Sequence, residues 1–507
     1  MNFNAPDIDY AGLSPIIALT AGLVLTLVVG LVGGSSRRER VVVSVFGIGT
    51  LAAAAGLEIW QWGEQKDLVA GALRLDDLAI ASSLIAIAAA GFCIPLSWRE
   101  DSVERPIGAS GHGEFQALLI CSVLGMTMLA AAQNLIALFV SLELLSIPLY
   151  VLCGSALRRE ESLESGLKYL IVGSLGSATL LYGLAFVYGA TGSTDFGGIA
   201  QGIRGSVVDD PLLLIGIALS ATGLAFKLSI APFHQWTPDV YQGAPTPVTA
   251  FMAVATKAAA FAAVVRFFEV ALGPAVDDWQ PALAALAAVS IVVGNAGALG
   301  QTSLKRLLGY SGVAQAGYMM VGVVAVTQAG TSALIFYLAA YALMNLAAFA
   351  VITIRERETV HGDEIAAVEG LGRVRPGLAA ALTVSMLALA GLPGTAGFIG
   401  KLYLIEAAVD SDYTWLAVMI AIGTMISLTY YLRVIAAVWM GPAEERPEGP
   451  MPAIAGASQE ADPTGARCRV ILGLTFVVTA ATIFFGFIPS PLVDWANQAG
   501  ASIASLI

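Results

Sequence analysis

Four charged residues lie inside stretches that are otherwise apolar, and their chemistry is the most informative feature of this sequence. Glu143 lies midway along NLIALFVSLELLSIPLYVL, and Lys257 lies near the middle of PVTAFMAVATKAAAFAAVV. Lys227 and Lys401 each lie close to a proline that interrupts an apolar run. A charge at the centre of a bilayer costs about 2.5–3.5 kcal/mol. These four residues must therefore be paired, neutralised or hydrated, which makes them candidates for binding and releasing protons.

Further ionisable residues in the apolar stretches are open to two interpretations. Lys168 follows Glu164 by four residues, so an ordinary helical i,i+4 ion pair explains it as well as function does. His234 lies just past the first proline break, and imidazole suits proton transfer, but a histidine there can equally be a simple hydrogen-bonding group. Arg266 and Arg433 lie near the ends of their apolar runs, so we expect them to extend towards the membrane surface rather than to take part in the chemistry.

The composition points to an integral membrane protein. Of the 507 residues, 57% are hydrophobic and only 12% are charged, against about 25% in soluble proteins. The net charge of −12, with scattered lysines and arginines, gives no indication of nucleic-acid binding. The cysteines are far apart and none lies in a CxxC motif, which argues against a zinc or iron–sulfur site; they are Cys93, Cys121, Cys153 and Cys468. The stretch GLPGTAG lacks the ending and the preceding strand of a phosphate loop.

The apolar runs predict an all-α polytopic fold with about fourteen transmembrane helices, because each run approaches the roughly 20 residues that a span needs. The predicted spans are 13–34, 41–60, 78–97, 115–132, 135–155, 165–190, 211–241, 247–271, 281–300, 307–326, 331–354, 377–409, 413–440 and 469–489.

Two of these spans are too long and carry breaks. Pro232 and Pro393 each remove a backbone donor, and each break has a lysine nearby, Lys227 or Lys401. Backbone groups freed at membrane depth survive only inside protein or beside water. The breaks lie five spans apart, which predicts two inverted five-helix repeats, spans 4–8 and 9–13. The predicted division is 1–114 (three N-terminal spans), 115–275 (first repeat), 276–441 (second repeat) and 442–507 (cytoplasmic loop and last span).

The basic residues predict the orientation, because loops rich in lysine and arginine stay in the cytoplasm. Alternate loops carry most of them, whereas the opposite loops hold only Lys66, Arg74 and Arg204. An even number of spans then places both termini on the outer side. The first residues, MNFNAPDIDY, have no basic segment of the kind that opens a cleavable signal peptide.

Three stretches resemble a known family. The run FKLSIAPFHQWTPDVYQGAPTPVTAFM (226–252) is similar to the helix 7–8 signature of the antiporter-like subunits of proton-pumping NADH–quinone oxidoreductase, respiratory complex I. Its WTPDVYQGAP resembles the form in the subunit-N branch, called subunit 2 in mitochondria. SLKRLLGYSGVAQAGYMMVG (303–322) and LALAGLPGTAGFIGKLYL (387–404) are similar to that branch's helices 10 and 12.

The resemblance implies a proton path through a line of buried charges. Carried over position by position, its residues are Glu143, Lys168, Lys227, His234, Lys257 and Lys401. Lys305 also matches a family lysine, although the orientation rule explains it equally well. We expect Glu143 to contact Lys168 or Lys227, directly or through one water.

The resemblance further implies a translocase subunit without a redox centre of its own. NADH, FMN, iron–sulfur clusters and a quinone, with menaquinone as one candidate, would then belong to partner subunits of a membrane arm in a bacterial inner (plasma) membrane. The alternative is a subunit of a multi-subunit cation/proton antiporter without redox coupling. A membrane scaffold with inert charges would leave four costly central charges unexplained.

Overall fold

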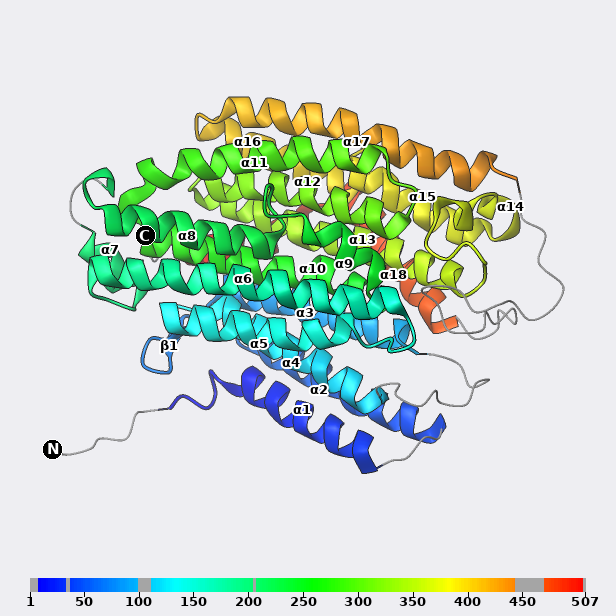
Figure 1. Ribbon diagram of the computed structural model, residues 1–507, viewed down its shortest axis with the longest axis horizontal. Helices are drawn as coiled ribbons and strands as arrows, with labels where there is room; N and C mark the ends of the chain where they lie inside the picture. The colour runs from blue at the N-terminus through cyan, green and yellow to red at the C-terminus, as the bar shows by residue number, and fades with distance from the viewer. Residues whose placement is uncertain (1–7, 33–36, 99–110, 204–206, 443–468, 505–507) are drawn as a thin grey trace.

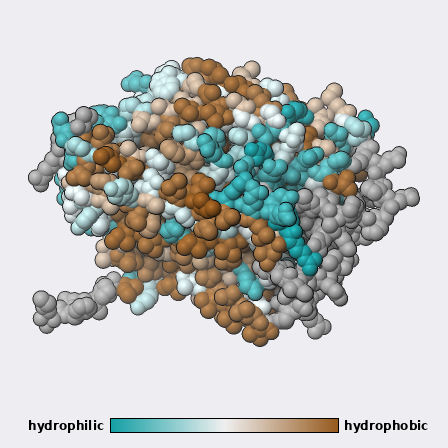
Figure 2. All heavy atoms as spheres, in the orientation of Figure 1, coloured by the Kyte–Doolittle hydropathy of each residue, from teal (hydrophilic) through white to brown (hydrophobic). Residues whose placement is uncertain are grey.

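The computed structural model describes residues 8–32, 37–98, 111–203, 207–442 and 469–504. Cys468 and most of the predicted cytoplasmic loop lie outside these ranges. Figure 1 shows the helices running side by side along the long axis, with α1 at one edge of the bundle and α17 at the opposite edge. Figure 2 shows apolar side chains over much of this face, as expected for a surface that meets lipid or partner proteins.

The N-terminal part contains three spans and a short hairpin. They are α1 (Ser14–Val32), α2 (Arg37–Trp60), β1 (Lys66–Leu68), β2 (Leu73–Leu75) and α3 (Asp77–Leu96). The two strands pair antiparallel, with Lys66 opposite Leu75. Asp76 caps α3 by accepting a hydrogen bond from the backbone N–H of Ala79.

The segment predicted as the first repeat contains five spans, of which one is interrupted. Its elements are α4 (His112–Ala131), α5 (Leu135–Cys153), α6 (Glu160–Thr191), α7 (Phe196–Gly202), η1 (Val207–Asp209), α8 (Pro211–Leu228), α9 (Trp236–Gly243), α10 (Thr246–Val265), the π-helix η2 (Arg266–Ala271) and η3 (Gly273–Ala275). The predicted break is confirmed, because α8 ends at Leu228 and α9 begins at Trp236.

The segment predicted as the second repeat has the same order of spans. Its elements are α11 (Val276–Leu299), α12 (Leu304–Val324), α13 (Gln328–Glu356), η4 (Ile365–Val368), α14 (Leu371–Val374), α15 (Pro376–Ala390), α16 (Ala396–Asp410) and α17 (Thr414–Met440). The break between α15 and α16 is again at the predicted place. The spans α10, α12 and α13 are buried over most of their length and form the centre of the molecule.

All fourteen predicted spans are present in the part of the chain that the structure describes. Thirteen helical segments are long and apolar enough to cross a membrane, and the fourteenth span is the interrupted pair α15–α16. The inverted relation of the two repeats remains a prediction.

The last span, α18 (Arg469–Phe487), is followed by α19 (Ser490–Ala504), which the sequence analysis did not predict. Its buried residues Ala496, Ala499 and Ile503 recur at helical spacing. Trp495 stacks on Trp62 with ring centroids 5.9 Å apart. The helix therefore joins the N-terminal spans to the second half of the molecule.

Candidate proton-transfer site at the two helix breaks

Lys227 lies in the last turn of α8 with 3% of its surface exposed. Its Nζ donates to the hydroxyl of Ser146 on α5 at 2.8 Å and to the phenol of Tyr169 on α6 at 3.1 Å. The helix ends at the next residue, Leu228, and its C-cap Ser229 takes a left-handed conformation with φ of 62°. The negative end of the α8 dipole also favours a cation at this place.

Glu143 lies on α5, one turn before Ser146, and is only partly buried. It lies within electrostatic range of Lys227. Within the described residues, however, it forms no ion pair at 4.0 Å or less, and its buried Oε1 has no hydrogen-bond partner. The expected direct contact with a lysine is therefore absent, and Ser146 takes the hydrogen bond that the carboxylate could have accepted.

Lys168 lies near the start of α6 rather than in the buried interior. Its side chain is 44% exposed and pairs with Glu164 at 2.6 Å and with Asp239 at 3.4 Å. The predicted i,i+4 ion pair with Glu164 is therefore present, and exposed pairs of this kind contribute about 0.2–1 kcal/mol.

His234 lies in the segment between α8 and α9, half-buried, directly after Pro232 and Phe233. Its Nδ1 is buried without a hydrogen-bond partner, and its ring centroid lies 6.2 Å from that of Tyr310 on α12. A ring nitrogen without a hydrogen-bond partner can bind a proton or accept a hydrogen bond from water.

Lys257 is buried in the middle of α10, with 1% of its surface exposed. Its Nζ donates to the backbone carbonyl of Leu228 at 3.1 Å, the last residue of α8. This carbonyl has lost its helical partner because the chain breaks there. Lys257 on α10 thus satisfies a backbone carbonyl that the break at the end of α8 leaves free.

Lys401 repeats this arrangement in the second half of the chain. It is 4% exposed in α16, and its Nζ donates to the carbonyls of Leu389 and Ala390 at 3.2 and 3.1 Å. Those residues are the last two of α15. The next residue, Gly391, has φ of +81°, and a Cβ built there would lie 2.8 Å from the Lys401 Cδ. The turn therefore needs glycine both for its backbone and for the lysine beside it.

A polar network on α12, which the sequence analysis missed, lies between Lys257 and Lys401. Ser311, Gln315 and Tyr318 face the same side of the helix at spacings of four and three. Ser311 hydrogen-bonds with Tyr431, and Tyr337 donates to Gln315. The signal in the sequence was the helical spacing of polar residues within an apolar span.

This network touches both lysines. A Cβ built at Gly312, next to Ser311, would lie 3.8 Å from the Lys257 Cε. Gln315 donates to the same Leu389 carbonyl as Lys401, at 3.1 Å. The Lys401 Nζ lies 4.8 Å from the ring centroid of Tyr318. The hydroxyl and amide groups of the network therefore reach Lys401 directly, and α12 passes beside the Lys257 side chain at Gly312.

The three buried lysines share one property: their hydrogen bonds go to neutral oxygens, and none has a carboxylate within 4.0 Å among the described residues. An intramembrane lysine without a fixed counter-ion is costly to keep, and such residues usually mark ion or proton pathways. The three lysines are therefore the strongest candidates for a functional role in this bundle.

One expectation for the remaining cations was wrong. Arg266 does not extend to the membrane surface; it is fully buried, pairs with Asp76 and donates to the Ala130 carbonyl at 2.6 Å. Lys305, for which two explanations were open, is 1% exposed and lies 3.7 Å from Glu356. Arg433 is exposed, as expected, and donates to two backbone carbonyls.

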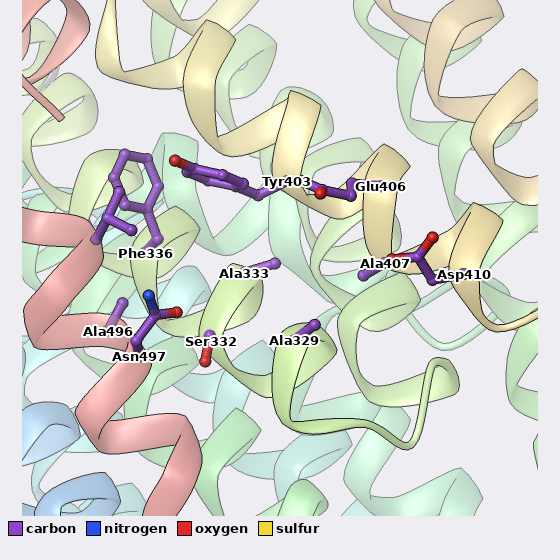
Figure 3. Close-up of a pocket in the computed structure, with 11 residues that line it drawn as sticks. Ala329, Ser332, Ala333, Phe336, Tyr403, Glu406, Ala407, Asp410, Ala496 and Asn497 are labelled. Carbon is purple, nitrogen blue, oxygen red and sulfur yellow. The ribbon is translucent and has the colours of Figure 1, made fainter. Parts of the chain in front are cut away.

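A cavity of about 220 Å³ lies beside α16, between α13 and α19. Figure 3 shows Tyr403, Glu406 and Asp410 on α16, opposite Asn497 on α19. Two of the carboxylates that line the cavity, Glu406 and Asp410, therefore lie on the same half-helix as Lys401. No group of three or more potential metal ligands occurs among the described residues.

Two interrupted spans with buried lysines at their breaks, within a bundle of fourteen spans, define an antiporter-like membrane subunit. Residues 132–427 match the family described as NADH:quinone oxidoreductase/Mrp antiporter, TM. The chain belongs to this family.

Individual relatives agree with this assignment. The chain is 39% identical over 485 residues to NADH-quinone oxidoreductase subunit N of Trichlorobacter lovleyi, covering 96% of this chain and 95% of the relative. It is 37% identical to subunit N 1 of Herpetosiphon aurantiacus, covering 99% of both chains. A chain of respiratory complex I from Thermus thermophilus matches with a TM-score of 0.78 and 34% identity, covering 95% of this chain and 98% of that one. A chain of the Mrp complex from Dietzia sp. has the same fold, with a TM-score of 0.81 at 21% identity.

Proposed function

We propose that this chain is the subunit-N-type membrane subunit of an NADH–quinone oxidoreductase and that it translocates protons. The observation that carries the proposal is the placement of Lys227, Lys257 and Lys401 at the two helix breaks, each hydrogen-bonded to neutral oxygens. The high identity to subunit N over nearly the whole chain supports the oxidoreductase assignment over a redox-independent antiporter.

In this role the chain moves protons while partner subunits carry electrons. NADH, FMN, iron–sulfur clusters and quinone are bound by those partners, and the chain lies in a bacterial inner membrane with both termini outside. Glu143 acts electrostatically on the protonation of Lys227, without direct contact. His234, in the break between α8 and α9, passes the proton between Lys227 and Lys257. The proton then passes from Lys257 along the α12 network to Lys401.

The energetic demand is moderate. Moving one charge against 100 mV costs about 2.3 kcal/mol. One pKa unit corresponds to about 1.4 kcal/mol. A shift of roughly two units per 100 mV is therefore enough, and the approach or withdrawal of a carboxylate or of water in a buried site supplies shifts of that size.

The test is to replace the relay lysines by arginine, which keeps the charge but does not release its proton. We expect Lys257→Arg and Lys401→Arg to assemble into the complex and to lose most NADH-driven proton uptake in inside-out vesicles. Arg433→Lys is the control, because that exposed residue binds carbonyls at the bundle surface. Near-normal proton uptake by both arginine variants would return these lysines to a structural role.

The partners can be tested separately by copurification. Recovery of flavin- and iron–sulfur-containing subunits with this chain supports the oxidoreductase assignment, whereas recovery of antiporter subunits alone favours the redox-independent alternative.

A further inference from the structure

A polar cleft opens at the end of the bundle that the basic loops predict to be cytoplasmic. It has a volume of about 730 Å³ and lies between α6 and α9 on one side and α12 and the 360–364 loop on the other. Its carboxylates come from both halves of the chain and include Glu161, Glu164, Asp239, Asp363 and Glu364. Figure 2 shows hydrophilic side chains gathered over the region where Figure 1 labels α9.

Three buried polar residues meet at the ends of three central helices, and we call them the junction triad: Thr246 of α10, Lys305 of α12 and Glu356 of α13. The Thr246 hydroxyl donates to Glu356 Oε2 at 2.6 Å, and the Lys305 Nζ lies 3.4 Å from the same hydroxyl. Lys305 also donates to the Ala244 carbonyl at 2.9 Å. All three residues of the triad are at most 3% exposed.

The triad adjoins residues that line the cleft. Glu356 is within electrostatic range of Asp363 and Arg159, and both of those residues line the cleft. Burial lowers the pKa of the Arg159 guanidinium, and the carboxylates of Glu356 and Asp363 act in the opposite direction. On α12 the neighbour of Lys305 is Arg306, which pairs with Asp239 in the cleft wall.

The same helix faces that form the triad lead inwards to Lys257. On α10, Lys257 follows Thr246 by eleven residues, which is about three turns and about 16 Å along the same face. On α12, Gly312 follows Lys305 by seven residues, about two turns, and approaches the Lys257 side chain.

On α13, Tyr341 lies about four turns from Glu356, and its phenol would touch a Cβ at Gly312. This phenol is buried and makes no hydrogen bond, so it offers a polar partner to water in this seam.

A purely structural ion pair would be built differently. The Lys305 and Glu356 atoms are 3.7 Å apart, and the buried Oε1 of Glu356 makes no hydrogen bond. A buried pair that serves only stability needs close geometry and satisfied lone pairs, and apolar residues often replace such a pair without loss. The open carboxylate oxygen of Glu356 is instead suited to accept a proton.

We propose that the cleft collects protons and that Glu356 is the first buried group to receive them on the way to Lys257. Glu356 accepts a proton from water in the cleft and becomes a neutral acid. It then gives that proton to water in the seam between α10, α12 and α13. This second transfer regenerates the Glu356 carboxylate, and the proton continues to Lys257. Lys305 and Thr246 position this carboxylate. The inference rests on the proposed function, because it adds an uptake route to the same lysine relay.

The first test uses two variants in the assembled complex, with the rate of NADH-driven proton uptake as the measurement. Glu356→Gln keeps the hydrogen bond from Thr246 but cannot carry a proton, and Thr246→Val removes the hydroxyl at nearly constant volume. A positioned proton-transfer group contributes about a hundredfold or more, so we expect Glu356→Gln to lower the uptake rate by about tenfold at least. Thr246→Val should lower the rate less than Glu356→Gln does, and Thr246→Ser, which keeps the hydroxyl, should have a rate close to that of the wild type.

Matched controls lie a few residues away. Glu358 pairs with Arg355 at 3.2 Å and with Arg375 at 2.7 Å at the same end of the bundle, but it is not part of the triad. Thr353 is a buried threonine that bonds only to the Phe349 carbonyl of its own helix. Glu358→Gln and Thr353→Val should therefore leave the rate of NADH-driven proton uptake unchanged.

A second measurement does not depend on the folding of the triad variants. Val360 is 42% exposed and lines the cleft, whereas Val374 is 43% exposed at the same end of the bundle and does not line it. A bulky, membrane-impermeant maleimide on Val360→Cys should slow proton uptake, and the same label on Val374→Cys or on the wild-type protein should not.

The outcomes separate the two proposals. If Lys257→Arg and Lys401→Arg lose proton uptake while Glu356→Gln, Thr246→Val and labelled Val360→Cys retain it, the uptake route is refuted and the lysine relay stands. If the arginine variants pump normally, the proposed function itself is refuted.

Discussion

The turn between α15 and α16 offers a test of how the protein positions Lys401. Gly391→Ala adds a methyl group that would lie 2.8 Å from the Lys401 Cδ and 3.2 Å from its Nζ. The lysine is the flexible partner in this contact, so its side chain must move. It would then lose its hydrogen bonds to the Leu389 and Ala390 carbonyls.

The size of the effect follows from these contacts. A hydrogen bond made by a charged group contributes about 1.5–3 kcal/mol, and each 1.4 kcal/mol changes an equilibrium about tenfold. Loss of one such bond should lower proton uptake by about tenfold or more. The left-handed backbone of an alanine costs a further ~1–2 kcal/mol of stability, which thermal unfolding of the purified complex measures.

Gly394→Ala is the matched control. Gly394 has φ of +84°, close to that of Gly391, but its added methyl group would meet the Phe487 ring at 3.3 Å and no lysine. Both variants should lose similar thermal stability, and only Gly391→Ala should lose proton uptake. Equal loss of uptake in the two variants would refute the positioning argument, because only backbone strain is common to them.

Two other predictions concern contacts that the sequence analysis did not foresee. Asp76→Asn leaves Arg266 buried without its counter-ion, so we expect the free energy of unfolding to fall by about 3–5 kcal/mol. The loss should appear as poor assembly on native gels, and adding Arg266→Met in a double variant should partly reverse it. Gln315→Leu interrupts the α12 network without altering any charge, so we expect normal assembly with slower proton uptake in vesicles. Uptake equal to the wild type would remove the network from the path.

The sequence was sufficient to locate the spans and the two breaks, because proline, glycine and intramembrane lysine each carry a large free-energy cost in a bilayer. It was not sufficient to locate the α12 network, since hydroxyl and amide groups are inexpensive to bury and stand out only by their spacing. The position of Arg266 was misjudged, and the partner of Lys305 was not foreseen, because their counter-ions, Asp76 and Glu356, are remote along the chain. Glu143 was expected to contact a lysine directly or through one water, and the direct contact is absent because Lys227 donates to Ser146 and Tyr169.

The joint made by α19 has a consequence for the order in which the protein is assembled. Trp495 stacks on Trp62, and the Ser502 hydroxyl accepts a hydrogen bond from the backbone N–H of Leu78. The two sides of this joint are more than 400 residues apart in sequence. Since α19 is synthesised after all fourteen spans, the joint closes only after the ribosome has delivered every span to the membrane. The N-terminal spans therefore gain this contact only after all fourteen spans have been made, so its closure reports that the spans on both sides of it have been inserted.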